Sequence, residues 1–153
     1  MDALELKVPP PVVALVIALA MWSIYRFMPG VDVGLLPRAA AALLLAAIGG
    51  AFSAAGITVF RRAKTTMNPM KPEATSALVT NGVYRFTRNP MYVGLLFVLL
   101  AWAAALGAPL GLLGPIAFIA YITRFQIVPE ERALRAAFGD AYVSYLTQVR
   151  RWL

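Results

Sequence analysis

The sequence predicts an all-α polytopic membrane protein, with about four transmembrane helices and short C-terminal cytoplasmic helices. Apolar residues make up 61% of the 153 residues, and the mean hydropathy is +0.74. Soluble domains are usually about half apolar. Four apolar stretches approach or exceed the roughly 17–25 residues that a membrane-crossing helix needs. The basic residues cluster beside these stretches, as in proteins whose flanks contact anionic lipid.

The four expected spans are approximately residues 12–28, 39–60, 90–106 and 110–127. The first stretch runs on past the point where a signal peptide would be cleaved, so we expect a retained helix. Gly107-Ala108-Pro109 separates the third span from the fourth. A link this short predicts an antiparallel helical hairpin. We therefore expect one membrane domain over residues 1–153.

Small residues recur along the second span. Ala46, Gly50 and Ala54 lie four residues apart, with Gly49 and Ser53 beside them. Small side chains at this spacing let two helices approach closely. The pattern favours packing inside the protein over packing between subunits.

The links between the spans differ in charge, which predicts the orientation. Basic residues follow the second span and the fourth: Arg61, Arg62, Lys64, Lys71, Arg85 and Arg88, and then Arg124, Arg132, Arg135, Arg150 and Arg151. The link at Gly107 carries no charge, and residues 29–37 carry only Asp32. The positive-inside rule therefore places both termini in the cytoplasm. We expect the inner membrane of a bacterium or archaeon, and we assign the net charge of +7 to membrane lipids, not to nucleic acid.

The chain contains neither cysteine nor histidine. Disulfides, thiolate nucleophiles, histidine bases and the usual zinc sites are thus excluded. We expect no metal, and any acid–base chemistry falls to Glu, Asp, Lys or Tyr.

Two polar segments, residues 61–92 and 128–153, are expected on the cytoplasmic face. Asn89 and Pro90 are typical of a helix start, with Asn89 at the N-cap. Glu130 and Glu131 follow Pro129 at the start of an amphipathic helix.

Gly139 is expected to end that helix, and Asp140 to cap another, whose apolar side includes Tyr142 and Tyr145. Each feature has a local structural explanation. Together they place cations, carboxylates and phenols around one pocket at the membrane boundary.

This order of elements resembles the integral membrane methyltransferases that include isoprenylcysteine carboxyl methyltransferase and the phospholipid methyltransferases. Their pattern is Gly-x-Tyr-Arg, Arg-His-Pro-x-Tyr, a helical hairpin, Glu-Glu and Phe-Gly-x-x-Tyr-x-x-Tyr. The matching residues are Gly82, Tyr84 and Arg85; Arg88-Asn89-Pro90-Met91-Tyr92; Glu130-Glu131; and Phe138-Gly139, Tyr142 and Tyr145. The resemblance covers about residues 60–153. It departs at Asn89, where the family has histidine, and at Gln148, where the family often has arginine.

The resemblance implies S-adenosylmethionine as the methyl donor, with S-adenosylhomocysteine as the product. It assigns cofactor binding to Arg88, Asn89, Pro90, Tyr92, Glu130, Glu131, Tyr142, Tyr145, Arg150 and Arg151, with Arg88, Asn89 and Glu130 as the catalytic residues. These residue types suit the donor. A glutamate accepts from its ribose diol or ammonium, an arginine holds its carboxylate, and tyrosine rings stack on adenine or face the sulfonium.

The expected acceptor is lipophilic and enters from the bilayer: an isoprenylcysteine-like carboxylate, a phospholipid amine or a small apolar molecule. Because the chain has no histidine, the sequence favours an acceptor that needs no strong base. Residues 65–69 are either a gate for this acceptor or a plain connecting loop.

Two other classes remain open from the sequence. One is an NADPH-dependent membrane reductase of the sterol reductase type. The other is a non-enzymatic membrane protein, such as a small four-helix exporter. A proton-coupled exporter needs an acidic residue inside a span, and the expected spans contain none.

Overall fold

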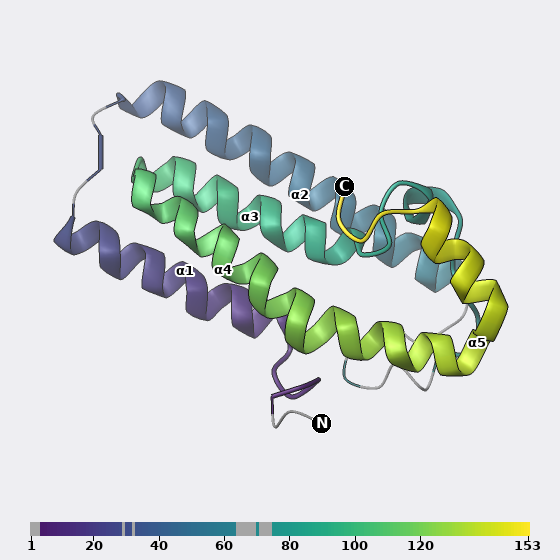
Figure 1. The fold of residues 1–153 in the computed structure, drawn as a ribbon. Helices are drawn as coiled ribbons and strands as arrows, with labels where there is room; N and C mark the ends of the chain where they lie inside the picture. The colour runs from purple at the N-terminus through teal and green to yellow at the C-terminus, as the bar shows by residue number, and fades with distance from the viewer. Residues whose placement is uncertain (1–3, 29, 32, 64–69, 71–74) are drawn as a thin grey trace.

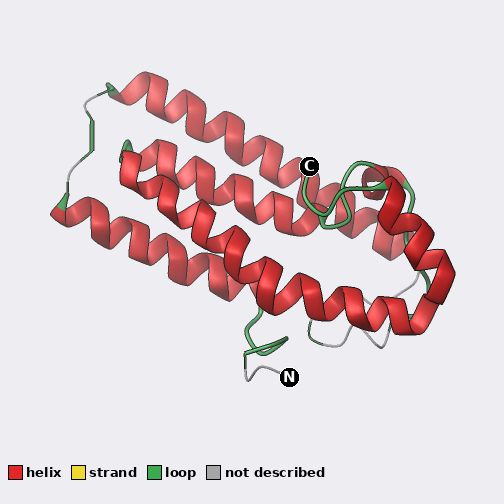
Figure 2. Cartoon of the chain, viewed as in Figure 1, coloured by secondary structure: helices red, strands yellow, loops and turns green. Residues whose placement is uncertain are grey.

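The computed structural model describes residues 4–28, 30–31, 33–63, 70 and 75–153, so the suggested gate at 65–69 lies outside the described residues. Its elements are α1 (Pro10–Phe27), α2 (Leu35–Ala63), the 3₁₀ turn η2 (Gly82–Arg85), α3 (Pro90–Leu106), the 3₁₀ turn η3 (Pro109–Leu112), α4 (Leu113–Ile122), the π-helical turn η4 (Thr123–Ile127) and α5 (Val128–Gln148). The described part contains helices and loops and no strand (Figure 2). The all-α prediction is confirmed.

The long helices lie side by side in one bundle (Figure 1). Three helices are long and apolar enough to cross a membrane: α1, α2 and the continuous helix Pro109–Gln148. The apolar part of this last helix ends near Ile127, and Glu130, Glu131 and Arg132 follow shortly after it. The third expected span, residues 90–106, is α3, which is apolar but only 17 residues long. The chain is an integral membrane protein.

Helix α2 packs against α3 through small residues. A Cβ atom added to Gly49 would lie 2.7 Å from the carbonyl oxygen of Gly94, and one added to Gly94 would overlap Ser53 Oγ. Side chains larger than hydrogen at these positions would push the helices apart. The second span therefore packs against another helix of the same chain, through Gly49 and Ser53.

The residues that make this contact differ from the predicted stripe. Ala46, Gly50 and Ala54 are exposed on the protein surface, and a Cβ on Gly50 would meet nothing within 4 Å. Neighbouring helix positions differ by about 100° in direction. Spacing alone therefore could not decide whether the face of Gly49 or that of Gly50 meets α3.

The two adjacent glycines give a matched test of this contact. Gly49→Ala is expected to lower the free energy of unfolding by about 1–3 kcal/mol, because its methyl group meets backbone. Gly50→Ala should leave that free energy unchanged or raise it by up to about 1 kcal/mol, as alanine favours helix over glycine. Thermal unfolding followed by circular dichroism in detergent measures both. Equal effects would contradict the close approach.

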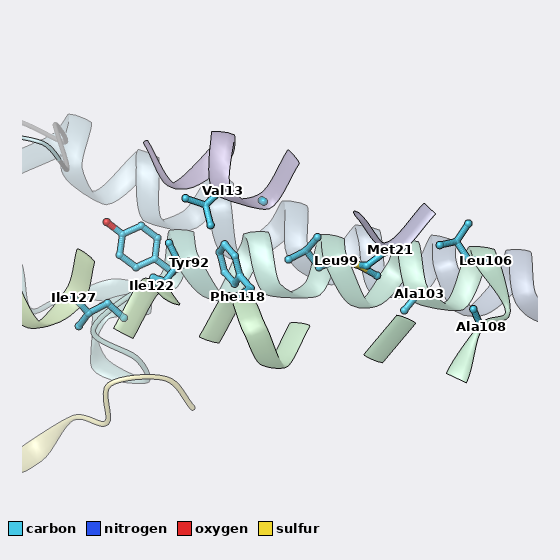
Figure 3. Packing of buried hydrophobic residues seen from close by; sticks show 11 residues of the cluster. Val13, Met21, Tyr92, Leu99, Ala103, Leu106, Ala108, Phe118, Ile122 and Ile127 are labelled. Carbon is cyan, nitrogen blue, oxygen red and sulfur yellow. The ribbon is translucent and has the colours of Figure 1, made fainter. Parts of the chain in front are cut away.

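The apolar core lies between α1, α3 and α4. Met21, Leu99, Phe118 and Ile122 are almost completely buried there. Figure 3 shows these side chains in a row, with Tyr92 at one end and its hydroxyl directed away from the apolar residues. The core therefore fixes the tyrosine ring and leaves its polar end for other contacts.

Helix α5 continues α4 through the π-helical turn and then changes direction. Gly139 has φ 51° and ψ −128°, which interrupts the helix. Glycine tolerates this backbone conformation best. The predicted helix end at Gly139 is confirmed, and the second half of α5 turns back (Figure 1), so that the C-terminal tail contacts the segment just before α3.

The N-terminal residues bind to this same long helix. The Glu5 carboxylate is buried and forms ion pairs with Arg124, at 2.9 Å, and with Arg132. The Leu6 N–H donates to the carbonyl oxygen of Phe125 in the π-helical turn, at 3.0 Å. These contacts join the N-terminal segment to the junction of α4 and α5.

Candidate functional site

A pocket lies at one end of the bundle, where α3 and α5 begin and α2 ends. Its lining comes from these three helices and from the segment before α3: Phe60, Thr75, Ala77, Leu78, Val79, Tyr84, Arg88, Asn89, Met91, Tyr92, Ile127, Glu130, Glu131, Leu134, Tyr142 and Tyr145. The pocket thus combines polar and charged groups with apolar side chains.

Most of the residues predicted for a site meet in this pocket: Arg88, Asn89, Tyr92, Glu130, Glu131, Tyr142 and Tyr145. Pro90 is buried in the first turn of α3 and starts that helix. Arg151 and Arg150 are not among the lining residues. Arg151 pairs with a lining residue, and Arg150 contributes its backbone carbonyl while its side chain is exposed.

Glu130 is held from two sides by hydrogen bonds to one of its oxygens. Tyr92 Oη and Gln126 Nε2 both donate to Glu130 Oε1, each at 2.6 Å. No described residue donates to Oε2. The carboxyl group is therefore fixed in direction and keeps one oxygen for a ligand.

The surroundings of Glu130 also change its proton affinity. It lies in the first turn of α5, beyond the apolar run. Burial raises its pKa to about 7, against the lowering effect of the hydrogen bonds from Gln126 and Tyr92, and the neighbouring charge of Glu131 adds to the rise. A cationic ligand next to Glu130 would stabilise its ionised form, which burial disfavours.

Glu131 bridges two arginines. Arg151 binds it with two hydrogen bonds, from Nε at 3.0 Å and from Nη2 at 2.7 Å, a geometry that adds both strength and direction. This bonding raises the pKa of Arg151. Arg88 Nη2 lies 3.3 Å from the same carboxylate, and Arg88 Nε is buried with no hydrogen-bond partner among the described residues.

Backbone carbonyls of the C-terminal tail tie it to the turn before α3. The Arg88 N–H donates to the Arg150 carbonyl at 3.0 Å, and Asn89 Nδ2 donates to the Arg151 carbonyl at 2.9 Å. Asn89 occupies the N-cap position as predicted, but its side chain makes no capping hydrogen bond. The Asn89 side chain is used for the tail instead, while the Asn89 N–H donates to the Thr87 hydroxyl at 3.2 Å.

Replacing Asn89 with aspartate is expected to release the tail, because a carboxylate cannot donate to the Arg151 carbonyl. Amide hydrogen exchange should become about fivefold to tenfold faster in the peptides that contain Arg88 and Arg151, as for loss of one hydrogen bond of about 1 kcal/mol. Asn81→Asp is the matched control, since Asn81 is exposed and its side chain caps nothing. Unchanged exchange in Asn89→Asp would show that this hydrogen bond does not hold the tail.

Further tyrosines line the same pocket. Tyr145 Oη donates to the Tyr84 carbonyl at 2.7 Å, and the Tyr84 ring packs edge-on against Phe60 with centroids 5.3 Å apart. Burial raises the pKa of Tyr145 to about 12, so its hydroxyl remains a hydrogen-bond donor at neutral pH.

The sequence analysis missed two polar residues that position the groups of this site. Gln126 is 2% exposed, and it lies four residues before Glu130, on the same face of the helix. A polar residue inside an apolar span was the signal that could have identified it. Thr87 is fully buried and accepts from the Asn89 N–H, a role that nothing in the sequence indicated.

Known proteins are similar to this chain in sequence. Residues 37–141 match the phospholipid methyltransferase family; the match thus starts in the first turn of α2, further toward the N-terminus than the predicted resemblance, and ends before the tail arginines. Protein-S-isoprenylcysteine O-methyltransferase A of Arabidopsis thaliana is 32% identical over 113 residues, 70% of this chain, so the match spans only 54% of that relative's length. An uncharacterized protein of Haemophilus influenzae is 52% identical over 63 residues, which are 41% of this chain and all of that protein. The chain therefore belongs to the phospholipid methyltransferase family.

Proposed function

We propose that this protein is an S-adenosylmethionine-dependent methyltransferase that acts on a lipophilic acceptor at the membrane boundary. The observation that carries the proposal is that an arginine and a glutamate in one pocket each have a polar atom not used by the described residues. Arg88 Nε has no acceptor among the described residues, and Glu130 Oε2 has no donor there. An arginine N–H and a carboxylate oxygen that lack partners among the described residues suit a ligand that carries both a carboxylate and an ammonium group.

The residues present fit this donor. Arg88 would hold its carboxylate, Glu130 its ammonium or ribose diol, and Tyr142 and Tyr145 offer rings for its adenine and sulfonium. When bound, S-adenosylmethionine supplies an electrophilic methyl group. The chain's own contribution is to align the reactants and to exclude water from the pocket.

The apolar wall favours a lipophilic acceptor. Phe60, Met91 and Ile127 line the pocket at the ends of helices that run through the bilayer. A carboxylate of the isoprenylcysteine kind, a phospholipid amine and a small apolar molecule all fit this description. Glu130, with its pKa of about 7, is suited to take a proton from an amine acceptor at neutral pH.

We place the pocket and both chain termini on the cytoplasmic side, in the inner membrane of a bacterium or archaeon. Arg61, Arg62, Arg85 and Arg88 lie at the pocket's end of the bundle. An excess of basic residues on one side is typical of the cytoplasmic side.

Calorimetric titration of the purified protein with S-adenosylhomocysteine tests the proposal. The wild type should bind one equivalent, and Arg88→Gln should bind at least about tenfold more weakly, as for loss of a charge-assisted hydrogen bond. Arg85→Gln is the control, because Arg85 lies three residues before Arg88 in the same segment but is exposed.

Circular dichroism must show that each variant is folded. A folded wild type that fails to bind S-adenosylhomocysteine, or that binds NADPH instead, would overturn the proposed function in favour of a reductase or a non-enzymatic role.

A further inference from the structure

An apolar groove lies at the opposite end of the bundle from the pocket. It runs between the start of α2 and the connection of α3 to α4, with walls that include Val33, Leu45, Leu100 and Leu112. Its volume is about 490 Å³, much larger than the roughly 30 Å³ of a water molecule. The groove therefore has room for part of a hydrocarbon chain.

Among the described residues that line the groove, Arg38 carries a charge. Arg38, in the first turn of α2, donates through Nη2 to the carbonyl oxygen of Ala105 near the end of α3. Its Nε is buried and has no hydrogen-bond partner among the described residues. Gly107 lies directly beneath the guanidinium, where an added Cβ would come within 2.8 Å of Nε.

The Arg38 charge also has no carboxylate partner in the described part of the chain. Placing an unpaired cation beside apolar side chains is costly, and an anion that reaches it would recover part of that cost. The groove combines this cation with a long apolar wall, which is the complement of an amphiphile with an anionic head.

We propose that the groove binds a phospholipid, with its phosphate on Arg38 and an acyl chain along the apolar walls. Arg38 lies at the end of a 29-residue apolar helix, which places it near the headgroup level, where lipid phosphates are the abundant anions. This site is at the other end of the bundle from the cofactor pocket, so it stands or falls independently of the methyltransferase proposal.

Native mass spectrometry of the detergent-purified protein, titrated with dioleoyl phosphatidylglycerol, tests the site. The wild type should retain one lipid, and Arg38→Gln should need about fivefold more lipid for half-saturation, as expected for one arginine–lipid contact. Arg26→Gln is the matched control and should bind like the wild type. Arg26 is exposed in the last turn of α1, at the same end of the bundle.

A second variant leaves the charge in place. Ala41 lines the groove, so Ala41→Leu should weaken lipid retention by filling the space for the acyl chain. This variant decides the question if Arg38→Gln fails to fold, as judged by circular dichroism.

Two further ligands separate the contributions of phosphate and chain. Dioleoylglycerol, which lacks phosphate, should bind equally weakly to the wild type and Arg38→Gln, and inorganic phosphate should not displace the lipid. Equal phosphatidylglycerol binding by the wild type, Arg38→Gln and Ala41→Leu would overturn the proposal. So would binding of dioleoylglycerol as strong as that of phosphatidylglycerol.

Discussion

Glu130→Gln is expected to weaken S-adenosylhomocysteine binding by about tenfold to a hundredfold. The substitution keeps the shape and the hydrogen bonds from Tyr92 and Gln126, but it removes the charge that attracts the ligand's ammonium. Charge-assisted hydrogen bonds contribute about 1.5–3 kcal/mol. Calorimetry measures the effect, with Asp140→Asn as the control, because Asp140 is an exposed carboxylate of the same helix.

The pH dependence distinguishes this role from simple disruption of the pocket. Because the pKa of Glu130 is about 7 in the folded, ligand-free protein, wild-type affinity should fall about tenfold per pH unit below 7. Without ligand the effect on stability has the opposite direction: the folded protein binds the proton more tightly than the unfolded chain, so stability falls as the pH rises from about 4.5 to about 7. Both slopes should disappear in Glu130→Gln. A wild-type affinity that is flat between pH 5.5 and 8 would show that the ligand does not use this carboxylate.

Glu131→Gln is expected to lower the free energy of unfolding by about 2 kcal/mol, because it leaves Arg88 and Arg151 without their shared carboxylate. Arg151→Gln should cost less, about 1 kcal/mol or below. The Arg151 side chain is 37% exposed and that of Arg88 only 12%, so water replaces the lost partner more easily at Arg151. Thermal unfolding of both single variants and the double variant measures the coupling.

The order of these two effects is the decisive result. If Arg151→Gln is as destabilising as Glu131→Gln, then the contact of Arg88 with Glu131 contributes nothing to stability. Arg135→Gln provides the background effect of removing an exposed arginine from α5.

The spans and the helix ends were predictable because they follow from local chemistry. Long apolar runs form helices in a bilayer, because no water is present there to hydrogen-bond the backbone N–H and C=O groups. Gly139 and Pro90 act through their own backbone preferences, so a helix break and a helix start could be placed from one residue each. That Arg88 and Glu131 lie at the same end of the bundle was also predictable. Arg88 precedes one arm of the short hairpin and Glu131 follows the other, so both lie at its open end.

The remainder depended on contacts that sequence does not encode locally. The π-helical turn at Thr123–Ile127 arises within an apolar run that reads as ordinary α-helix. The tail binds through the carbonyls of Arg150 and Arg151, and a backbone carbonyl is the same in every residue. The resemblance assigned the tail arginines to the cofactor through their side chains, and it gave no sign that their backbone carbonyls hold the turn at Asn89.

The ion pairs of Glu5 have a consequence for how the protein is made. Glu5 is synthesised long before its partners, because Arg124 and Arg132 follow it by 119 and 127 positions along the chain. During insertion into the membrane this carboxylate must stay hydrated at the surface. Helix α1 must therefore cross the bilayer before the ion pairs that later hold its N-terminal end have formed. The last steps of assembly then depend on synthesis of the junction between α4 and α5, which makes closure of the bundle a late, long-range event.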